Sequence, residues 1–453
     1  MRNMKIHLIA IGGAVMHNMA MALHNKGIRV TGSDDEIFEP SRSRLEKYGL
    51  LPERTGWDPD RITPELDGVI LGMHAKEDNP ELIRAQMLRL KIWSFPEYIY
   101  EQCREKKRVV IGGSHGKTTV TSMIMHVLRY NHFDFDYMVG SQLEGFETMV
   151  RLTKDAPIVI LEGDEYLSSP IDRRPKFHLY HPHIAVLTGI AWDHVNVFPT
   201  FENYKNQFSE FVTQIDPSGH LFCYSDDQLL QEIGSEATCE TTFYDAHPFG
   251  VTGNETFLET GSQKLKIPVF GAHNMQNIRA AQLVCRELGV TDEQFYEAIP
   301  SFRGAARRQE LLAESEEKKI YLDFAHAPSK VRATIESFRE RWPKEQIYAF
   351  LEIHTFSSLN KDFLPQYENS LEKADTAYVF YDPHVVEFKN LPPLEKSFVS
   401  KSFGSSNVIV LDDKYELRKI ALNQGKGIYL MMSSGSFSGL DLKDLASEIV
   451  KKN

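Results

Sequence analysis

Short apolar runs typical of buried β-strands alternate with helical stretches along almost the whole chain. In the first hundred residues the runs KIHLIAI, IRVTGSD and GVILGM are separated by turn residues and by a helical stretch over 16–24. Strands that alternate with helices in this way build βαβ units, and βαβ units form parallel sheets. The alternation therefore predicts an α/β fold.

The alternation falls into three segments, for which we predict domains over 1–105, 106–300 and 301–453. The second segment carries the runs RVVIG, PIVILEG and HIAVLTG, and the third carries KIYLDF, IYAFLE, AYVFY, NVIVL and GIYLMM. A chain of 453 residues is too long for one ordinary hydrophobic core, so a division into domains is expected from length as well. We predict three consecutive α/β domains.

Charge and composition narrow the range of partners. The formal net charge of -12 argues against a general affinity for nucleic acid, because the phosphate backbone attracts basic surfaces. No window approaches the roughly 18 consecutive apolar residues that a membrane-spanning helix needs, and the N-terminus lacks the apolar core of a signal peptide. We expect a cytoplasmic protein that acts on small molecules and binds neither nucleic acid nor membrane.

The cysteines do not form a recognisable disulfide or zinc pattern. They are far apart in the sequence and show no C-x-x-C spacing, and they are Cys103, Cys223, Cys239 and Cys285. In a chain without an export signal, this pattern favours ordinary thiols.

The stretch GGSHGKTT at 112–119 follows the strand-like run RVVIG and precedes a helical stripe. The stripe consists of apolar residues at helical spacing, namely Val120, Met123, Ile124, Val127 and Leu128. A strand-to-helix turn of this kind aims backbone N–H groups at an anion, while Lys117 adds positive charge and the Thr118 hydroxyl is suited to Mg²⁺. The full P-loop pattern requires glycine at 111, where the chain has Ile111. We predict phosphate binding here, with a glycine-rich connector as the alternative.

Two further strand ends carry polar side chains. Glu162 ends the run PIVILE, and His194 follows the run HIAVLTG. Because parallel strands place their carboxyl ends at one edge of the sheet, we expect both side chains near the metal and phosphates held by Lys117 and Thr118. Taken singly, Glu162 could cap a turn and His194 could be an interior histidine.

The first turn of the chain, AIGGAVMHNMA, fills one of the three glycine positions of the dinucleotide fingerprint, at Gly12. Asp34 follows about 20 residues later, where an acid could bind a ribose hydroxyl. An aspartate at a strand end is as often a turn or cap residue. The sequence leaves these two interpretations of Asp34 open.

Six motifs together resemble those of the Mur ligase family, ATP-dependent amide-forming enzymes of peptidoglycan synthesis. They occur in the family's order and spacing over nearly the whole chain, and they are GGSHGKTT, EGDEY, AWDH, GAHNMQNIRAA, FRGAARRQEL and LDFAHAPS. The resemblance implies a UDP-sugar-binding first domain, a P-loop-containing central ATPase domain, and a Rossmann-like third domain that binds the amine substrate and closes on ATP. ATP and Mg²⁺ are the implied cofactors.

The resemblance also implies roles for individual residues. The implied ATP site contains Gly113, Ser114, His115, Gly116, Lys117, Thr118, Thr119, Asn274, Asn277 and Arg308. Polar residues that cap a helix are the alternative for the two asparagines. The implied metal ligands are Thr118, Glu162 and His194, and the implied catalytic residues are Lys117, Glu162, His194, Arg308, Asp323 and His326. For the UDP sugar we expect contacts from Gly12, Gly13, Asp34 and His74.

The stretch EGDEYLSSPIDRRPKFHLYHP resembles most the family members that join the tripeptide L-alanyl-γ-D-glutamyl-meso-diaminopimelate to UDP-N-acetylmuramate in peptidoglycan recycling. Ligation of L-alanine to the same nucleotide is the alternative, followed by a phosphotransferase of another class and a nucleotide-binding protein without catalysis. The chain departs from the family at Gly189, Leu322 and Ala327, usually Asn, an acid and His, and at His354, where the family carries an arginine-bearing strand. We expect a monomer or a weak homodimer.

Overall fold

The computed structural model describes residues 4–261, 263–404 and 407–452. These residues form two compact units. The first unit comprises Met1–Ile190, Lys205–Asp245 and Ala280–Ala298, and the second comprises Ala191–Tyr204, Ala246–Arg279 and Ile299–Asn453. The predicted domain limits at 105 and 300 stay predictions, since the compact units divide the chain at other positions.

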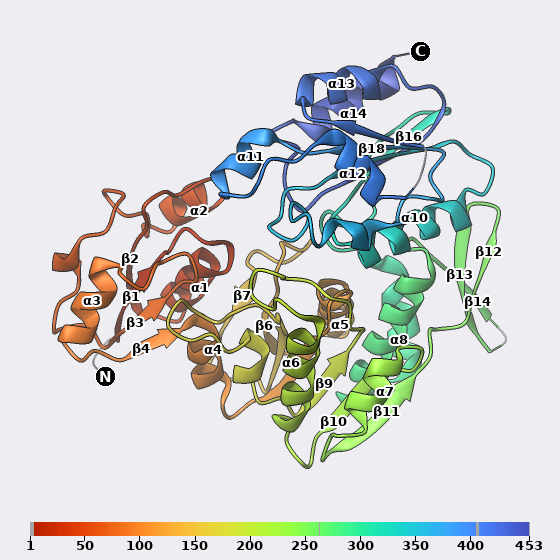
Figure 1. Cartoon of the computed structure of the whole chain (residues 1–453). Coiled ribbons are helices and arrows are strands. Elements are labelled where there is room, and N and C mark those ends of the chain that lie inside the picture. The colour runs from red at the N-terminus through yellow and green to blue at the C-terminus, as the bar shows by residue number, and fades with distance from the viewer. Residues whose placement is uncertain (1–3, 262, 405–406, 453) are drawn as a thin grey trace. The chain divides into compact units, whose positions relative to one another are not determined.

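A four-stranded parallel sheet opens the first unit, at the red end of the chain in Figure 1. Its order is β2-β1-β3-β4, and its strands are β1 (Lys5–Ile9), β2 (Arg29–Ser33), β3 (Gly68–Leu71) and β4 (Ile92–Ser94). The helices of this region are α1 (Ala14–Asn25), α2 (Ser41–Lys47), α3 (Pro80–Met87) and α4 (Phe95–Cys103), with a 3-10 turn η1 at Pro59–Arg61. The predicted parallel sheet of the N-terminal segment is confirmed.

The second sheet of this unit has seven strands in the order β11-β10-β9-β5-β8-β6-β7. They are β5 (Lys107–Gly112), β6 (Phe135–Met138), β7 (Val150–Arg151), β8 (Ile158–Glu162), β9 (Ile184–Leu187), β10 (His220–Tyr224) and β11 (Glu240–Tyr244). All pairings are parallel except that of the short edge strand β7. Because β5 lies between β8 and β9, the turns that follow these three strands meet at one edge of the sheet.

The remaining helices of the chain's middle part are α5 (Lys117–Tyr130), α6 (Phe201–Thr213), α7 (Gln228–Gly234), α8 (Ala272–Glu287) and α9 (Asp292–Ala298), with 3-10 turns η2 (Lys176–Leu179) and η3 (Ile299–Ser301).

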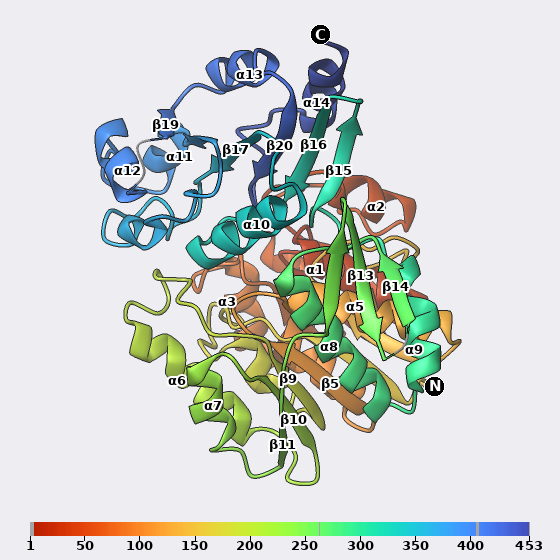
Figure 2. The same ribbon diagram turned by 90° about the vertical axis from the view of Figure 1, so that its right-hand side faces the viewer.

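The second unit contains a three-stranded antiparallel sheet that the sequence analysis did not predict. Its strands are β12 (Phe249–Thr252), β13 (Glu255–Thr260) and β14 (Gln263–Ile267), and Figure 2 shows β13 beside β14.

The largest sheet of the second unit has six strands in the order β15-β16-β20-β17-β18-β19. They are β15 (Glu310–Glu314), β16 (Lys318–Asp323), β17 (Ile347–Glu352), β18 (Thr376–Phe380), β19 (Val408–Leu411) and β20 (Gly427–Met432), and β15 alone among these pairs antiparallel. The helices are α10 (Pro328–Arg341), α11 (Pro383–Phe388), α12 (Lys396–Ser402), α13 (Lys414–Leu422) and α14 (Leu442–Lys451), with a 3-10 turn η4 at Leu364–Tyr367.

The inner strands of this sheet, β16, β17, β18 and β20, are buried on both faces, which explains why they appear as unbroken apolar runs. In β17, Ala349 and Leu351 belong to one hydrophobic cluster, while Phe350 between them belongs to another on the opposite face. A strand covered on both sides needs apolar residues at every position rather than at alternate ones. The α/β fold class that the sequence predicts is confirmed.

All four cysteines lie in the first unit as free thiols. Cys103, Cys223 and Cys285 are fully buried, and burial raises the pKa of Cys103 and Cys223 to about 12. None of the helices in the described part of the chain is long and apolar enough to cross a membrane.

Candidate active site

The turn Gly113–Gly116 joins the end of β5 to the start of α5, as the sequence predicts. Gly116 is the N-cap residue of α5 and has a φ of 79°, a left-handed conformation that favours glycine. Val120 and Ile124 of the predicted stripe are fully buried. The N-terminus of α5, including Lys117, Thr118 and Thr119, therefore stands at the carboxyl edge of the sheet, where a helix dipole favours an anion.

Lys117 is held at this turn by a carboxylate that the sequence analysis did not select. Its Nζ donates to Glu165 Oε2 at 2.6 Å and to the Gly113 carbonyl at 2.7 Å. Burial disfavours the ammonium charge, but the negative charges of Glu165 and Asp164 outweigh burial and raise the pKa of Lys117. Lys117 is therefore a cation at physiological pH.

Thr118 and Glu162 present two oxygen atoms side by side next to Lys117. The Thr118 hydroxyl donates to Glu162 Oε1 at 2.8 Å, and the Gly140 N–H donates to Glu162 Oε2 at 2.7 Å. Burial raises the pKa of Glu162, and the Gly140 and Lys117 interactions only partly oppose this. A buried carboxylate beside a hydroxyl is the oxygen donor set that Mg²⁺ prefers, so these residues fit the predicted ion.

The residues after β9 fix the shape of the phosphate turn. The Ser114 N–H donates to the Gly189 carbonyl at 2.9 Å, and the Thr188 hydroxyl donates to the His115 carbonyl. Gly189 has a φ of 149°, and a Cβ atom there would lie 2.1 Å from Cε1 of His115. The His115 ring thus occupies the space that a side chain at position 189 would need.

The predicted UDP-sugar residues meet in pairs at the first turn of the four-stranded sheet. The Gly12 N–H donates to Asp34 Oδ2 at 2.7 Å, and a Cβ on Gly13 would lie 3.7 Å from the His74 ring. Burial, together with the neighbouring Asp35, raises the pKa of Asp34 to about 6. Asp34 therefore supports the turn through this hydrogen bond, and its contact with a ribose hydroxyl stays a prediction.

In the second unit, Asp323 at the end of β16 accepts hydrogen bonds from two backbone N–H groups. Its Oδ2 accepts from the Gln309 N–H at 2.9 Å, and its Oδ1 accepts from the Ala325 N–H at 2.8 Å. The neighbouring Arg308 guanidinium lies over the Phe324 ring at 4.8 Å. The predicted site residues Arg308 and Asp323 therefore both lie near the end of β16.

His194 begins a small charged cluster in the same unit. Its N–H donates to Asp193 Oδ1 at 2.7 Å, and Lys330 Nζ lies 3.5 Å from Asp193 Oδ2. Burial opposes ionisation of Asp193, but His194, Lys330 and His326 outweigh it and hold the pKa of Asp193 well below its usual range. His194 itself has a φ of 55°, in the left-handed region.

His326 is half-buried beside this cluster. Its Nδ1 lies 2.9 Å from the Phe324 carbonyl, so Nδ1 carries the hydrogen when the ring is neutral and Nε2 remains an acceptor. Burial and the positive charge of Lys330 lower the pKa of His326 to about 3. The ring is therefore neutral at physiological pH.

The two asparagines of the GAHNMQN motif are buried on the first turns of α8. Asn274 Nδ2 donates to the Phe270 carbonyl at 2.8 Å and to Gln309 Oε1 at 3.1 Å, and Asn277 Nδ2 lies 3.4 Å from Asn274 Oδ1. Their side chains connect the start of α8 to residues near Arg308 within the second unit.

Sequence reasoning missed Glu165, Lys330 and Thr188 as members of these clusters. Glu165 lies within the quoted motif EGDEY, and its burial beside Lys117 depends on how the chain turns after β8. Lys330 follows the quoted motif LDFAHAPS directly. A search for ionisable residues within and beside the motifs would have found both.

Comparison with known proteins supports the resemblance. Residues 5–107 match the model described as Mur ligase family, catalytic domain, and residues 111–285 match that of the Mur ligase middle domain. The UDP-N-acetylmuramate–L-alanyl-γ-D-glutamyl-meso-2,6-diaminoheptandioate ligase of Haemophilus influenzae is 29% identical over 97% of this chain and 98% of its own. The UDP-N-acetylmuramate–L-alanine ligase of Caldicellulosiruptor bescii is 31% identical over 85% of both chains.

A solved structure shares the fold over the full length. The murein peptide ligase of Psychrobacter arcticus superposes with a TM-score of 0.71 at 21% identity and covers 99% of each chain. The family models cover the four-stranded sheet, almost all of the seven-stranded sheet and the three-stranded sheet β12–β14. The Haemophilus influenzae relative extends the match into the six-stranded sheet. The chain therefore belongs to the Mur ligase family, whose members are ATP-dependent ligases that form carbon–nitrogen bonds.

Proposed function

We propose that the chain joins the lactyl carboxylate of UDP-N-acetylmuramate to the amine of the tripeptide L-alanyl-γ-D-glutamyl-meso-diaminopimelate, with conversion of ATP to ADP and phosphate. The observation that carries the ATP-dependent part is the convergence of Lys117, Thr118 and Glu162 at the carboxyl ends of β5 and β8. The tripeptide, rather than L-alanine, is favoured by the stretch Asp172–Phe177.

This stretch is connected through Asp164 to the surroundings of Lys117. Lys176 Nζ donates to Asp164 Oδ2 at 2.5 Å, and Asp164 in turn contributes to the charge around Lys117. Arg174 binds Asp172 through two nitrogen atoms. The residues that resemble the tripeptide-specific members therefore border the loop that carries Glu162 and Glu165.

The chemistry follows from the need to activate a carboxylate. A free carboxylate does not react with an amine at a useful rate because an oxide is a poor leaving group. The lactyl carboxylate attacks the γ-phosphorus of ATP, which gives an acyl phosphate and ADP. The peptide amine then adds to the acyl carbon, and the tetrahedral intermediate expels phosphate as the amide forms. Lys117 stabilises the charge on the transferring phosphoryl group, a task of positioning and electrostatics.

The proposed metal ligands are Thr118, Glu162 and His194. Mg²⁺, when bound, neutralises charge on the phosphate oxygens during transfer. Burial raises the pKa of Glu162, and the Gly140 N–H, the Lys117 charge and the Thr118 hydroxyl act in the opposite direction. Thr118 keeps one Glu162 oxygen in place and Gly140 keeps the other.

The remaining proposed roles concern binding and proton transfer. Gly12, Gly13, Asp34 and His74 bind the UDP sugar, and Asn274, Asn277 and Arg308 contact ATP. His326 is the proposed base for the amine proton, and its Nδ1 is held at the Phe324 carbonyl. It is unprotonated at neutral pH, as a base must be, but a pKa of about 3 means that it holds a proton weakly until negative charge develops nearby.

The test is phosphate release from MgATP with UDP-N-acetylmuramate, with tripeptide or L-alanine added in separate reactions and the product identified by mass. Turnover with tripeptide alone supports the proposal. Turnover with L-alanine alone assigns the chain to the alanine-adding reaction instead. A stable phosphorylated product without dependence on an amine, or ATP binding without turnover, contradicts ligation.

A further inference from the structure

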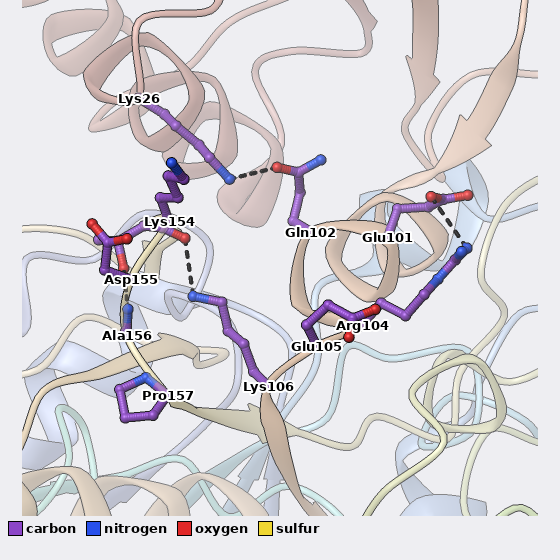
Figure 3. A pocket seen from close by; sticks show the side chains of 11 residues that line it. Lys26, Glu101, Gln102, Arg104, Glu105, Lys106, Lys154, Asp155, Ala156 and Pro157 are labelled. Carbon is purple, nitrogen blue, oxygen red and sulfur yellow. Dashed lines mark hydrogen bonds and ion pairs between the residues drawn. The ribbon is translucent and has the colours of Figure 1, made fainter.

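A polar cavity lies in the first unit, at the start of β5. The turn with Lys117 follows the other end of this strand. The cavity has a volume of about 500 Å³ and is lined by Lys26 after α1, by the end of α4 and its link to β5, and by residues 153–157 before β8. Figure 3 shows Lys26, Lys106 and Lys154 on one side of the cavity, whereas Glu101 and Arg104 point away from them. Since β5 spans six residues, the cavity is separated from the phosphate turn by roughly 20 Å of strand.

Lysine side chains form the floor of this cavity. Lys106 is 6% exposed, and its Nζ donates to Asp136 Oδ2 at 2.6 Å and to the Thr153 carbonyl at 2.9 Å. Lys26 Nζ donates to Gln102 Oε1, a neutral partner, at 2.6 Å. An ammonium has three N–H donors, so each lysine retains donor capacity beyond these bonds.

The two ammonium groups repel each other. Burial, followed by the positive charge of Lys106, lowers the pKa of Lys26, and the opposing electrostatic effects of Cys103 and Asp136 are smaller. Asp136 is already bonded to Lys106 and to the Thr153 N–H and hydroxyl. The hydrogen bond described for Lys26 Nζ is therefore to an amide oxygen and not to a carboxylate.

Of the acidic side chains of the cavity, Glu101 lies away from the lysines, whereas Asp155 lies beside Lys154. Glu101 forms ion pairs with Lys91 at 3.0 Å and Arg104 at 3.3 Å, and Figure 3 shows it on the side of the cavity opposite Lys26. Glu105 and Asp155 are exposed at the rim. A rim of mixed sign disfavours a long polyanion such as nucleic acid, whereas a cationic floor accommodates a small one.

We propose that this cavity binds a small oxyanion of the phosphate class, with Lys26, Lys106 and Lys154 as its cationic contacts. Lysine binds phosphate as a mobile point charge, and a dianion relieves the repulsion between Lys26 and Lys106 better than a monocarboxylate does. Two sources share this chemistry: inorganic phosphate, which the ligase reaction releases, and a phosphate monoester. Binding connects the end of α1 to the start of the seven-stranded sheet.

The experiment measures anion binding with the nucleotide site filled. The full chain is saturated with a non-hydrolysable ATP analogue and Mg²⁺, and inorganic phosphate, methyl phosphate or sulfate is titrated by calorimetry at constant ionic strength. Pulse labelling of lysines with acetic anhydride, read by mass spectrometry, follows each residue. We expect saturable phosphate binding and protection of Lys26, because a bound dianion favours the protonated ammonium and lowers the fraction of free amine, which is the form that reacts with the anhydride.

Variants separate the cavity from general charge. Lys26→Gln and Lys154→Gln should each weaken phosphate binding about tenfold, the size expected for loss of one charge-assisted contact, while Lys26→Arg should retain most of it. Lys107→Gln removes an exposed charge next to Lys106 that does not line the cavity and should have no effect. A stronger response to methyl phosphate than to inorganic phosphate identifies a monoester as the ligand.

Absence of saturable binding, or binding that Lys26→Gln and Lys154→Gln leave unchanged, overturns the proposal. Because the measurement requires no turnover, its result is independent of which amine the ligase accepts.

Discussion

Two strand-to-helix turns of the first unit have the same place in the fold but opposite electrostatics. The turn after β5 ends in Lys117, whose charge is matched by Glu165. The turn after β1 has no basic residue, and its Gly12 N–H is already bonded to the protein's own Asp34. Both turns stand at the carboxyl edge of a parallel sheet, where ligands bind. The fold therefore determines where a ligand can bind, and the charges at each turn determine which ligand.

The largest effect should come from removing the positive charge of Lys117 at the turn after β5. Lys117→Met should reduce kcat/KM about 10²–10³-fold, the usual cost of losing one preorganised electrostatic contact to the transition state. Steady-state phosphate release measures this, with circular dichroism to check folding. Lys264→Met, at an exposed position on β14, is the control. If Lys117→Met keeps its activity within a factor of about two of the parent, the turn after β5 needs a positive charge no more than the turn after β1 does.

The carboxylate next to that turn should rank second. Glu162→Gln should raise the Mg²⁺ concentration needed for half-maximal activity by at least about 10–100-fold, the range seen when a partner of a metal ligand is removed. Glu165→Gln is the matched control, because Glu165 contacts Lys117 rather than Thr118. If both variants respond equally to Mg²⁺, Glu162 is not a metal ligand.

Gly189→Ala tests whether the shape of the nucleotide turn matters as much as its charge. The added Cβ would meet the His115 ring in a left-handed backbone conformation, so we expect a loss of about 1–3 kcal/mol of stability and a higher KM for ATP. Thermal unfolding and ATP titration measure these two effects. Gly253→Ala, also left-handed but in open space, isolates the backbone contribution, and an equal KM in both variants would refute the steric explanation.

The smallest effect concerns the turn after β1 and depends on pH. The folded state raises the pKa of Asp34 to about 6, so the folded chain binds more protons than the unfolded chain between about pH 4 and 6. The corresponding stability is present below pH 4 and is lost as the pH rises through 6. Asp34→Asn imitates the neutral acid and should therefore be more stable than the parent at pH 8, by roughly 1–2 kcal/mol after solvent screening.

This difference should vanish near pH 4. Denaturant unfolding at both pH values measures it, and Glu36→Gln, an exposed neighbour, should show no such change. A variant that is less stable than the parent at pH 8 would show that the Asp34 charge strengthens the Gly12 bond by more than burial costs.

The sequence predicted most of the parallel framework because strands buried on both faces leave unbroken apolar runs, as in β17 and β20. It did not predict β12–β14, whose polar residues such as Lys264 and Glu255 are exposed and leave no such run. The phosphate turn could be located from the helical stripe after Lys117. The contact of Lys117 with Glu165 could not, because it depends on the path of the loop after β8 and not on residue spacing.

The positions of the cysteines allow the opening of the first unit to be measured with its own thiols. All four thiols lie in that unit, and the three buried ones belong to α4, β10 and α8. A thiol that is both buried and protonated reacts with an alkylating agent only after the structure around it opens. Alkylation rates of the unmodified chain therefore give the opening free energy of the first unit separately from the second, with and without nucleotide, and require no introduced label.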